Sequence, residues 1–206
     1  MSKISIIDYG MGNLHSVVKA LGRVGADAVI IDKAEDIIKA DKIVLPGVGA
    51  FRDAIATLQE KDMVEPIKEV VASGKPFIGI CLGFQMLFDV GYEDGCYDGL
   101  GIIGGTVEKF EFGDNPKNLK VPHMGWNSLK ICGEQPLFKG IEDESFVYFV
   151  HSYYVKPSDD AVAATKTTHG IEFVSSIHKD NVYGVQFHPE KSQTVGMKIL
   201  ENFVGI

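Results

Sequence analysis

The chain has 206 residues, of which 45% are hydrophobic and 23% are charged, and its formal net charge is −8. This composition is typical of a folded globular protein and argues against long disordered segments. The negative charge, without any run rich in Lys and Arg, argues against a surface for nucleic acid or for an anionic membrane. A small molecule or another protein is therefore the expected partner.

Length and cysteine usage indicate one domain in a reducing compartment. A chain of this length can bury one sizeable core, so we expect a single domain over residues 1–206. Cys81, Cys96 and Cys132 have no metal-type spacing, which supports neither a disulfide framework nor a zinc site. No signal-peptide pattern is present, and no apolar run approaches the roughly 20 residues that cross a bilayer. We expect a cytoplasmic protein that needs no metal or organic cofactor.

Strands and helices alternate in the first part of the chain. Short apolar strands are predicted at residues 3–8, 28–31, 42–45 and 77–80. Apolar residues at helical spacing predict helices at residues 14–24, 34–40, 50–59 and 63–73. Such alternation is typical of a parallel sheet with right-handed crossovers, and the reactive edge of that sheet lies at the carboxyl ends of its strands.

The pattern changes after Gly91. Strand-like segments then follow one another with few helices between them, at residues 106–112, 128–131, 146–150, 162–168, 172–177 and 182–187. A last amphipathic helix carries Leu200, Phe203 and Val204. We therefore predict an α/β fold of three layers, with a mostly parallel central sheet, helices on both faces and a mixed or antiparallel extension.

Residues 79–85, with the sequence Gly-Ile-Cys-Leu-Gly-Phe-Gln, place a cysteine at a turn between a predicted strand and a helical pattern over residues 82–88. Gly79 and Gly83 would relieve the crowding of this turn, as the glycines of a Gly-x-Ser-x-Gly nucleophile elbow do. The turn would aim the thiol at free N–H groups that favour the thiolate. A small buried apolar residue is the alternative interpretation of Cys81.

Two further motifs lie at predicted strand ends. The Pro-Gly-Val-Gly segment at residues 46–49 could turn backbone N–H groups toward an oxyanion, or it is an ordinary strand-to-helix turn. His188 ends the last predicted strand, and Glu190 follows it closely. A thiol nucleophile needs a base, and the base needs a carboxylate that fixes its tautomer. Cys81, His188 and Glu190 supply one of each.

Two other segments are more ambiguous. Gly10-Met11-Gly12 lacks the third glycine of the dinucleotide fingerprint, because His15 occupies that place, which argues against a nucleotide or flavin site. Trp126 lies in a predicted loop between glycine and proline breaks. A large aromatic residue there is a core residue or an interface anchor, and the residues alone favour the core.

The chain resembles the class I (triad) glutamine amidotransferases in residues 46–49, 79–85 and 186–192, and the resemblance covers essentially its whole length. Within that family, three segments are similar to the glutaminase subunits of imidazole glycerol phosphate synthases, which act in histidine biosynthesis. These segments are residues 8–13, 122–127 and 149–153.

The resemblance implies that Cys81 attacks the side-chain amide of glutamine, with His188 as base and then acid and Glu190 orienting it. It implies an oxyanion hole built from Gly47, Val48, Gly49 and Leu82. The implied glutamine-binding positions are Gly49, Gln85, His151, Ser152 and Tyr153.

The resemblance also implies a partner. Ammonia would pass to a (β/α)₈ cyclase subunit that makes imidazole glycerol phosphate and aminoimidazole carboxamide ribotide. The implied contacts with that subunit are Asn13, Trp126 and Lys191, which changes the interpretation of Trp126 from a core residue to an interface anchor.

Other functions stay open at this point. The chain could feed ammonia to a different synthase, since the triad does not specify the acceptor. It could also be an inactive module that serves only as a partner surface, or a flavin or nucleotide binder on a similar sheet. We also expect the isolated chain to be weakly active, because a glycine-rich oxyanion loop can sit with its N–H turned away until a partner biases it.

Overall fold

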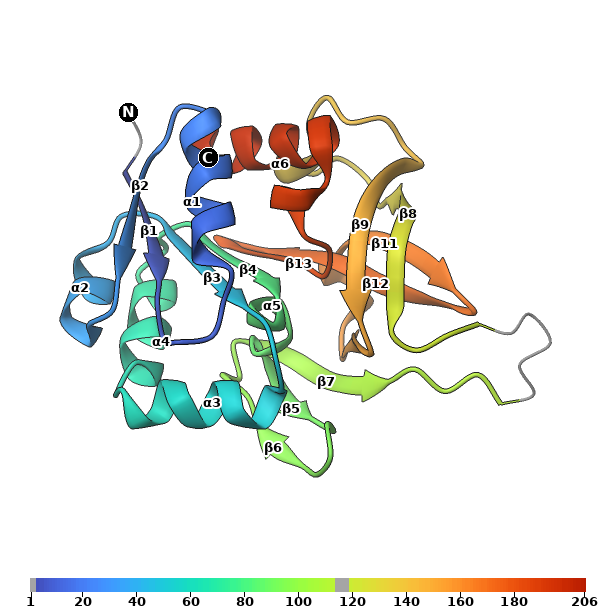
Figure 1. The fold of residues 1–206 in the computed structure, drawn as a ribbon, viewed down its shortest axis with the longest axis horizontal. Coiled ribbons are helices and arrows are strands. Elements are labelled where there is room, and N and C mark those ends of the chain that lie inside the picture. Colours follow the sequence, from blue (N-terminus) through green and yellow to red (C-terminus); the bar gives the residue numbers. More distant parts are fainter. Residues whose placement is uncertain (1–2, 114–118) are drawn as a thin grey trace.

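Parallel strands form the centre of the fold, which the computed structural model describes over residues 3–113 and 119–206. The central strands are β1 (Lys3–Ile7), β2 (Asp27–Ile31), β3 (Ile43–Gly47), β4 (Phe77–Cys81) and β13 (Val182–Val185). They pair in the order β2-β1-β3-β4-β13 and run in one direction (Figure 1). Continuous apolar runs suit such strands, because both faces of a parallel sheet are covered.

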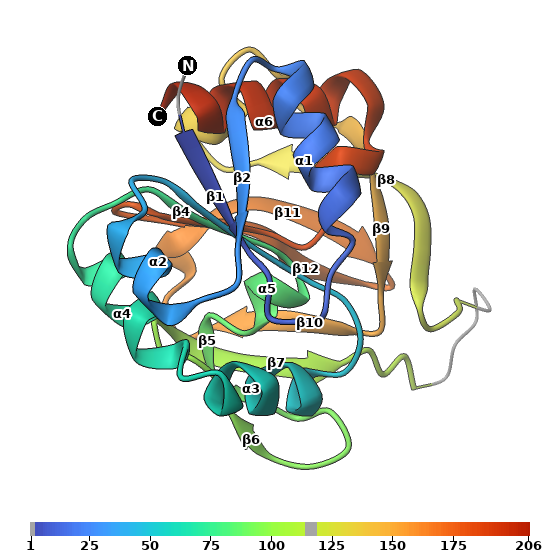
Figure 2. The same cartoon turned by 60° about the vertical axis from the view of Figure 1, so that its left-hand side comes forward.

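Helices cover both faces of this sheet. On one face lie α1 (Leu14–Arg23) and α6 (Gln193–Gly205); on the other lie α2 (Ala34–Lys39), α3 (Phe51–Glu60) and α4 (Val64–Ala72) (Figure 2). Each long helix turns an apolar stripe to the sheet; in α1 this stripe consists of Val17, Ala20 and Leu21. The predicted three-layer fold is confirmed.

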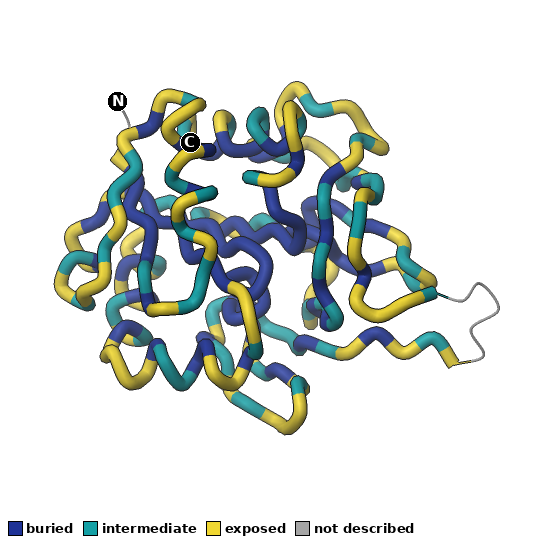
Figure 3. The backbone as a smooth tube through the Cα atoms, in the orientation of Figure 1, coloured by how far each residue is buried: buried dark blue, intermediate teal, exposed yellow. Residues whose placement is uncertain are grey.

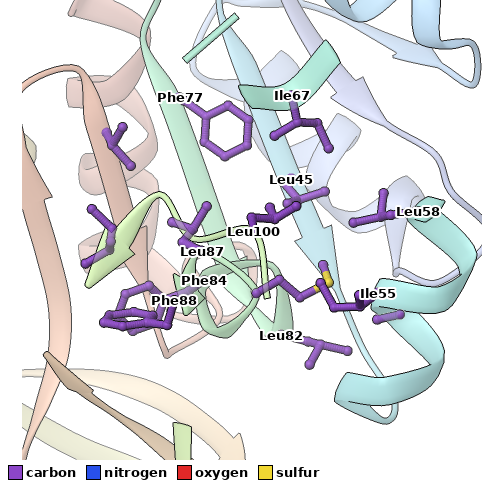
Figure 4. Packing of buried hydrophobic residues seen from close by; sticks show 14 of the residues in the cluster. Leu45, Ile55, Leu58, Ile67, Phe77, Leu82, Phe84, Leu87, Phe88 and Leu100 are labelled. Atoms are coloured by element: carbon purple, nitrogen blue, oxygen red, sulfur yellow. The ribbon is translucent and has the colours of Figure 1, made fainter. Parts of the chain in front are cut away.

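A separate hydrophobic core fills each side of the sheet. The buried residues follow the central strands, while the outer sides of the helices are exposed (Figure 3). On the side of α3 and α4, Leu45 of β3 and Phe77 of β4 pack toward Leu58 and Ile67 (Figure 4). Helices α3 and α4 therefore pack directly on β3 and β4, the two strands that lead to residues 46–49 and to Cys81.

A mixed extension continues the sheet beyond β13, as predicted. Its strands are β12 (Ile171–Lys179), β10 (Tyr153–Pro157), β7 (Ile103–Lys109), β5 (Phe88–Gly91) and β6 (Tyr97–Asp98), in that order. A branch of β11 (Ala163–His169), β8 (His123–Ile131) and β9 (Ser145–His151) joins it, because β11 pairs with both β12 and β8, and β8 pairs with β9 (Figure 1).

Two local predictions were wrong. The helix after Cys81, α5, covers only Leu82–Gln85 instead of residues 82–88. The carbonyl groups of residues 86–89 accept hydrogen bonds from the N–H groups of residues 99–103. The chain therefore leaves the helix and enters β5. The segment of residues 122–127 is not a loop, because strand β8 begins at His123.

The helices of this fold are short. Within the described ranges, none is both long and apolar enough to span a membrane.

Candidate active site

Cys81 ends strand β4 in a strained turn. Its backbone has φ 56° and ψ −109°, a left-handed conformation that is rare for a residue with a side chain. A Cβ on Gly79 would lie 2.7 Å from the carbonyl oxygen of Gly83, and a Cβ on Gly83 would overlap the carbonyl oxygen of Leu45. The predicted steric role of the two glycines is confirmed.

The thiol of Cys81 borders a cavity of about 340 Å³ at the carboxyl ends of β3 and β4. This cavity brings together most of the residues singled out in the sequence. Its lining includes Val48, Gly49, Cys81, Leu82, Gln85, His151, Ser152, Tyr153, His188 and Lys191. Segments that are far apart in the sequence thus meet at one edge of the sheet, where the strand order predicted them.

His188 and Glu190 form a buried pair next to this cavity. His188 Nδ1 lies 2.8 Å from Glu190 Oε1, and their side chains are 4% and 2% exposed. The peptide N–H of His188 donates to the carbonyl of Tyr148, 2.9 Å away on β9. Burial alone would lower the pKa of His188, but the hydrogen bonds and charges of Cys81 and Glu190 raise it to about 9. The site therefore favours the protonated imidazole of His188.

The second oxygen of Glu190, Oε2, is buried and has no hydrogen-bond partner among the described residues. His188 and Glu190 line a second cavity, of about 10 Å³, together with Asn13 and Gly47. Asn13, a predicted interface residue, thus lies behind the triad carboxylate, outside the larger cavity.

The oxyanion segment at residues 46–49 packs tightly against the elbow. A Cβ on Gly47 would lie 2.7 Å from the hydroxyl oxygen of Tyr9 and 2.8 Å from the backbone nitrogen of Gly83. Gly49 has a left-handed φ of 101°. Only glycine fits this approach and this φ without strain, so glycine lets the loop pack against the first turn of α5.

Gln85 is tied to the nucleophile by a buried network. Its Nε2 donates to the carbonyl of Tyr153 and to Oε1 of Gln186, each at 2.9 Å. Gln186 Nε2 in turn lies 3.8 Å from Cys81 Sγ. The sequence analysis assigned no role to Gln186, although it stands in the same motif as His188.

Glu93 also lines the main cavity and was missed by the sequence analysis. Its Oε2 accepts a hydrogen bond of 2.6 Å from the backbone N–H of Phe51, at the start of α3. This bond holds the Glu93 carboxylate at the cavity, and the other carboxylate oxygen, Oε1, takes no part in it. No sequence motif marks the residue, which lies in the turn between β5 and β6.

An exposed apolar strip lies beside the cavity on β8 and β9. Trp126 is 45% exposed, Met124 62% and Phe146 57%. Trp126 pairs across the strands with Tyr148, over whose ring Lys191 Nζ lies at 5.9 Å. Trp126 is therefore not a core residue.

Within residues 3–113 and 119–206, no group of three or more His, Cys, Asp or Glu residues is arranged to hold a metal ion.

Comparison with known proteins gives matches over the full length of the chain. The family described as "Glutamine amidotransferase class-I" matches residues 5–206. A relative from Geobacter sulfurreducens, named imidazole glycerol phosphate synthase subunit HisH, is 52% identical over 98% of both chains. A Campylobacter jejuni protein, named imidazole glycerol phosphate synthase subunit HisH 1, is 50% identical over 98% of both.

Solved structures share the fold at lower identity. A structure described as a glutamine amidotransferase superposes with a TM-score of 0.74 at 16% identity, and covers 98% of this chain and 99% of its own. PurLQS from Thermotoga maritima gives a TM-score of 0.73 at 20% identity, over 98% and 97% of the two chains. These two likenesses concern the fold alone.

Proposed function

The chain belongs to the class I glutamine amidotransferases, and on this premise we propose that it hydrolyses glutamine to glutamate and ammonia through Cys81, His188 and Glu190. It is the glutamine amidotransferase subunit of an imidazole glycerol phosphate synthase, in histidine biosynthesis. The observation that carries the proposed chemistry is that Cys81 and His188 line one cavity while Glu190 binds the Nδ1 side of His188.

Acylation begins from the thiolate of Cys81. Because the pKa of His188 is raised to about 9, the imidazole holds a proton at neutral pH beside the sulfur. Sγ attacks the side-chain amide carbon of glutamine, and the tetrahedral intermediate collapses as His188 gives its proton to the leaving nitrogen. Ammonia leaves and a γ-glutamyl thioester remains on Cys81.

The negative charge of the intermediate needs hydrogen-bond donors. The backbone N–H of Leu82, at the start of α5, supplies one, and a backbone N–H of the loop at residues 46–49 supplies the other. These donors act where negative charge develops, so they stabilise the transition state more than they stabilise bound glutamine.

Hydrolysis of the thioester restores the enzyme. Neutral His188 takes a proton from water, whose oxygen attacks the thioester carbon, and Cys81 leaves as the thiolate. The proton stays on His188, so the ion pair forms again. Glu190 holds the imidazole in one orientation through both steps by its bond to Nδ1.

The cavity offers matching groups for the amino-acid end of glutamine. The Glu93 carboxylate suits the α-ammonium group, since a charge-assisted hydrogen bond is stronger than a neutral one. Gln85, His151, Ser152 and Tyr153 line the same cavity. We infer that these residues select a free amino acid carrying a side-chain amide.

The ammonia is consumed by a partner subunit, which we propose to be a (β/α)₈ cyclase that docks on the strip of Met124, Trp126 and Phe146, with Lys191 at its border beside Tyr148 and Asn13 as a further contact. An exposed tryptophan among other apolar side chains is typical of a binding hot spot. A cytoplasmic location fits this biosynthetic role.

A glutaminase assay of the full chain with its purified (β/α)₈ partner tests the proposal. We expect release of glutamate with glutamine as substrate, and no release by Cys81→Ser, which folds but lacks the thiol. The isolated chain should be slower, and the partner with its nucleotide should raise turnover. If the wild-type complex releases no more glutamate than Cys81→Ser, the chain is an inactive module; activity with another synthase alone would assign it to a different pathway.

A further inference from the structure

A chain of buried hydrogen bonds begins at Asn127 on β8. Asn127 Nδ2 lies 3.1 Å from His123 Nε2, and His123 Nδ1 lies 2.9 Å from His151 Nε2. His123 and His151 face each other as a cross-strand pair of β8 and β9, and both are buried. We call Asn127, His123 and His151 the histidine relay.

The partners at its two ends determine where each proton lies. The carbonyl of Tyr153 can only accept, so His151 Nδ1, 2.8 Å away, carries a proton. Neutral His151 then accepts at Nε2, which requires a proton on Nδ1 of His123. His123 Nε2 must accept from Asn127, whose amide is fixed because its Oδ1 accepts from the Ser128 N–H at 2.9 Å. All donors of the relay thus point the same way.

Both histidines are neutral at physiological pH. Burial lowers the pKa of His123 to about 4, assisted by His169, whose ring stacks on it at 4.2 Å. Burial lowers the pKa of His151 to about 3. The hydrogen bond to the Tyr153 carbonyl raises this pKa, whereas the neighbouring His123, His169 and His188 lower it further. A second proton on either ring would also set two N–H groups against each other.

The histidine relay is connected to Cys81 through the carbonyl group of Tyr153. The same Tyr153 carbonyl accepts from Nε2 of Gln85 at 2.9 Å, and Gln85 also holds the Oε1 of Gln186. Gln186 Nε2 is the group that lies 3.8 Å from Cys81 Sγ. One carbonyl oxygen therefore links the histidines to the amide network around the thiol.

The relay begins at the exposed apolar strip. Asn127 follows Trp126 directly on β8, and its Nδ2 also donates to the carbonyl of Thr168 on β11 at 2.9 Å. A change in the position of β8 would therefore move Asn127 and His123 together, and would reach His151 on β9 through the hydrogen bond between the two histidines.

We propose that Asn127 and His123 are positioning residues for glutamine hydrolysis, which fix the Tyr153 carbonyl and through it Gln85, Gln186 and the Cys81 thiol. The inference rests on the proposed function. Neither residue contacts the reacting atoms; both act by the direction of their hydrogen bonds.

The isosteric substitution Asn127→Asp tests this direction. A carboxylate has no proton to donate, so His123 must place a proton on Nε2 to meet it. It then either reverses its tautomer, which leaves the Nε2 of His151 without its donor, or becomes charged in the core. Nitrogen-15 NMR of labelled histidine side chains in the full chain reads this without any assay. We expect protons on Nδ1 of His123 and His151 in the wild type, and a proton on Nε2 of His123 in Asn127→Asp.

Kinetics of the complex with the (β/α)₈ partner give the second readout. We expect kcat for glutamine hydrolysis to fall about tenfold in Asn127→Asp with little change in KM, since about 1.4 kcal/mol of transition-state stabilisation corresponds to that factor. Asn127→Ala removes the donor without reversing the histidines, and should lose less. Asn181→Asp is the matched control, because its amide also donates to backbone carbonyls, those of Val71 and Lys75, but lies outside the relay.

The outcomes separate this inference from the proposed function. A wild-type complex without glutaminase activity would remove the proposed function and this inference with it, whatever the NMR spectra show. The positioning role alone would be overturned if the wild-type complex is active and Asn127→Asp shows reversed histidine tautomers but the same kcat as the wild type. A lowered kcat with unchanged tautomers would also overturn it, because the loss would then have another cause.

Discussion

His188 Nδ1 lies 2.8 Å from Glu190 Oε1, and this bond leaves the opposite ring nitrogen, Nε2, for the Cys81 side of the site. The 3₁₀ turn at Pro189–Lys191 keeps the two residues close in sequence and in space. The pair is almost free of solvent, so its interaction is weakly screened.

Substitution of Glu190 by Gln should lower kcat for glutamine hydrolysis by about 10²- to 10⁴-fold, as removal of the orienting carboxylate does in related triads. KM should change little, because Glu190 does not line the main cavity. Steady-state kinetics of the complex measure both. Glu201→Gln, which loses only an exposed ion pair with Lys198, is the control and should retain the wild-type rate. A Glu190→Gln enzyme with normal kcat would exclude Glu190 from the triad.

The stability of the protein should fall at high pH. The folded-state pKa of His188 is raised from its ordinary 6.5 to about 9, so the stabilisation is complete below pH 6.5 and is lost as pH rises through 9. Its size is on the order of 3 kcal/mol. Urea unfolding of the wild type and of His188→Gln between pH 6 and pH 10 measures it: the difference between the two proteins should shrink as the pH rises. A difference that does not change with pH would contradict the assigned pKa.

Replacement of Gly83 by Ala should destabilise the fold by about 3 kcal/mol or more, because the new methyl group would overlap the Leu45 carbonyl oxygen, which belongs to a central strand. Gly22→Ala is the matched control. A methyl group there meets open space on helix α1, so it should raise the free energy of unfolding by about 0.5 to 1 kcal/mol. Denaturant unfolding compares the two, and equal effects would mean that the elbow tolerates a side chain.

Glu93→Gln should raise KM for glutamine about tenfold or more and leave kcat nearly unchanged. The substitution keeps an acceptor for the Phe51 N–H but removes the charge offered to the substrate ammonium, and a hydrogen bond to a charged group contributes about 1.5–3 kcal/mol. Asp94→Asn, an exposed neighbour outside the cavity lining, serves as control. Unchanged KM in Glu93→Gln would assign the α-ammonium to another residue.

Trp126→Ala should weaken binding of the (β/α)₈ partner about 30-fold or more, because an exposed tryptophan at the centre of an interface typically contributes at least about 2 kcal/mol. Titration calorimetry of the two purified subunits gives the affinity. Ile30→Ala removes another exposed apolar side chain, on the edge strand β2, and should bind like the wild type. Equal affinities would place the interface elsewhere.

The alternating strands and helices up to Cys81, and the turn at Cys81 itself, could be predicted because they depend on local signals. Apolar runs bounded by turns marked β1, β3 and β4, and glycines at 79 and 83 marked the elbow, since the backbone of α5 and β3 approaches too closely there for any side chain. The carboxyl-end rule for parallel strands then placed Cys81 and residues 46–49 together without coordinates.

The rest depends on contacts that no local pattern reports. The short helix α5 ends because residues 99–103 take its next carbonyl groups, and that partner is distant in sequence. Glu93 reaches the cavity because the Phe51 N–H binds it, and Gln186 reaches Cys81 because Gln85 holds it. Pro122 and Gly125 predict a loop at the start of β8, because both residues commonly interrupt strands. Gly125 nevertheless lies within the strand, with φ 135°.

The left-handed backbone of Cys81 bears on how such a chain could lose its activity. For any residue with a Cβ, φ 56° and ψ −109° carry strain of about 1–3 kcal/mol, whereas glycine adopts the mirror image of the extended region freely. A Cys81→Gly chain should therefore be inactive and free of this strain, and the relief would offset part of the stability lost with the buried thiol and its contact with His188. Loss of the nucleophile would then cost less stability at this position than at an unstrained core residue, so a chain that has lost its chemistry could still survive as a folded subunit.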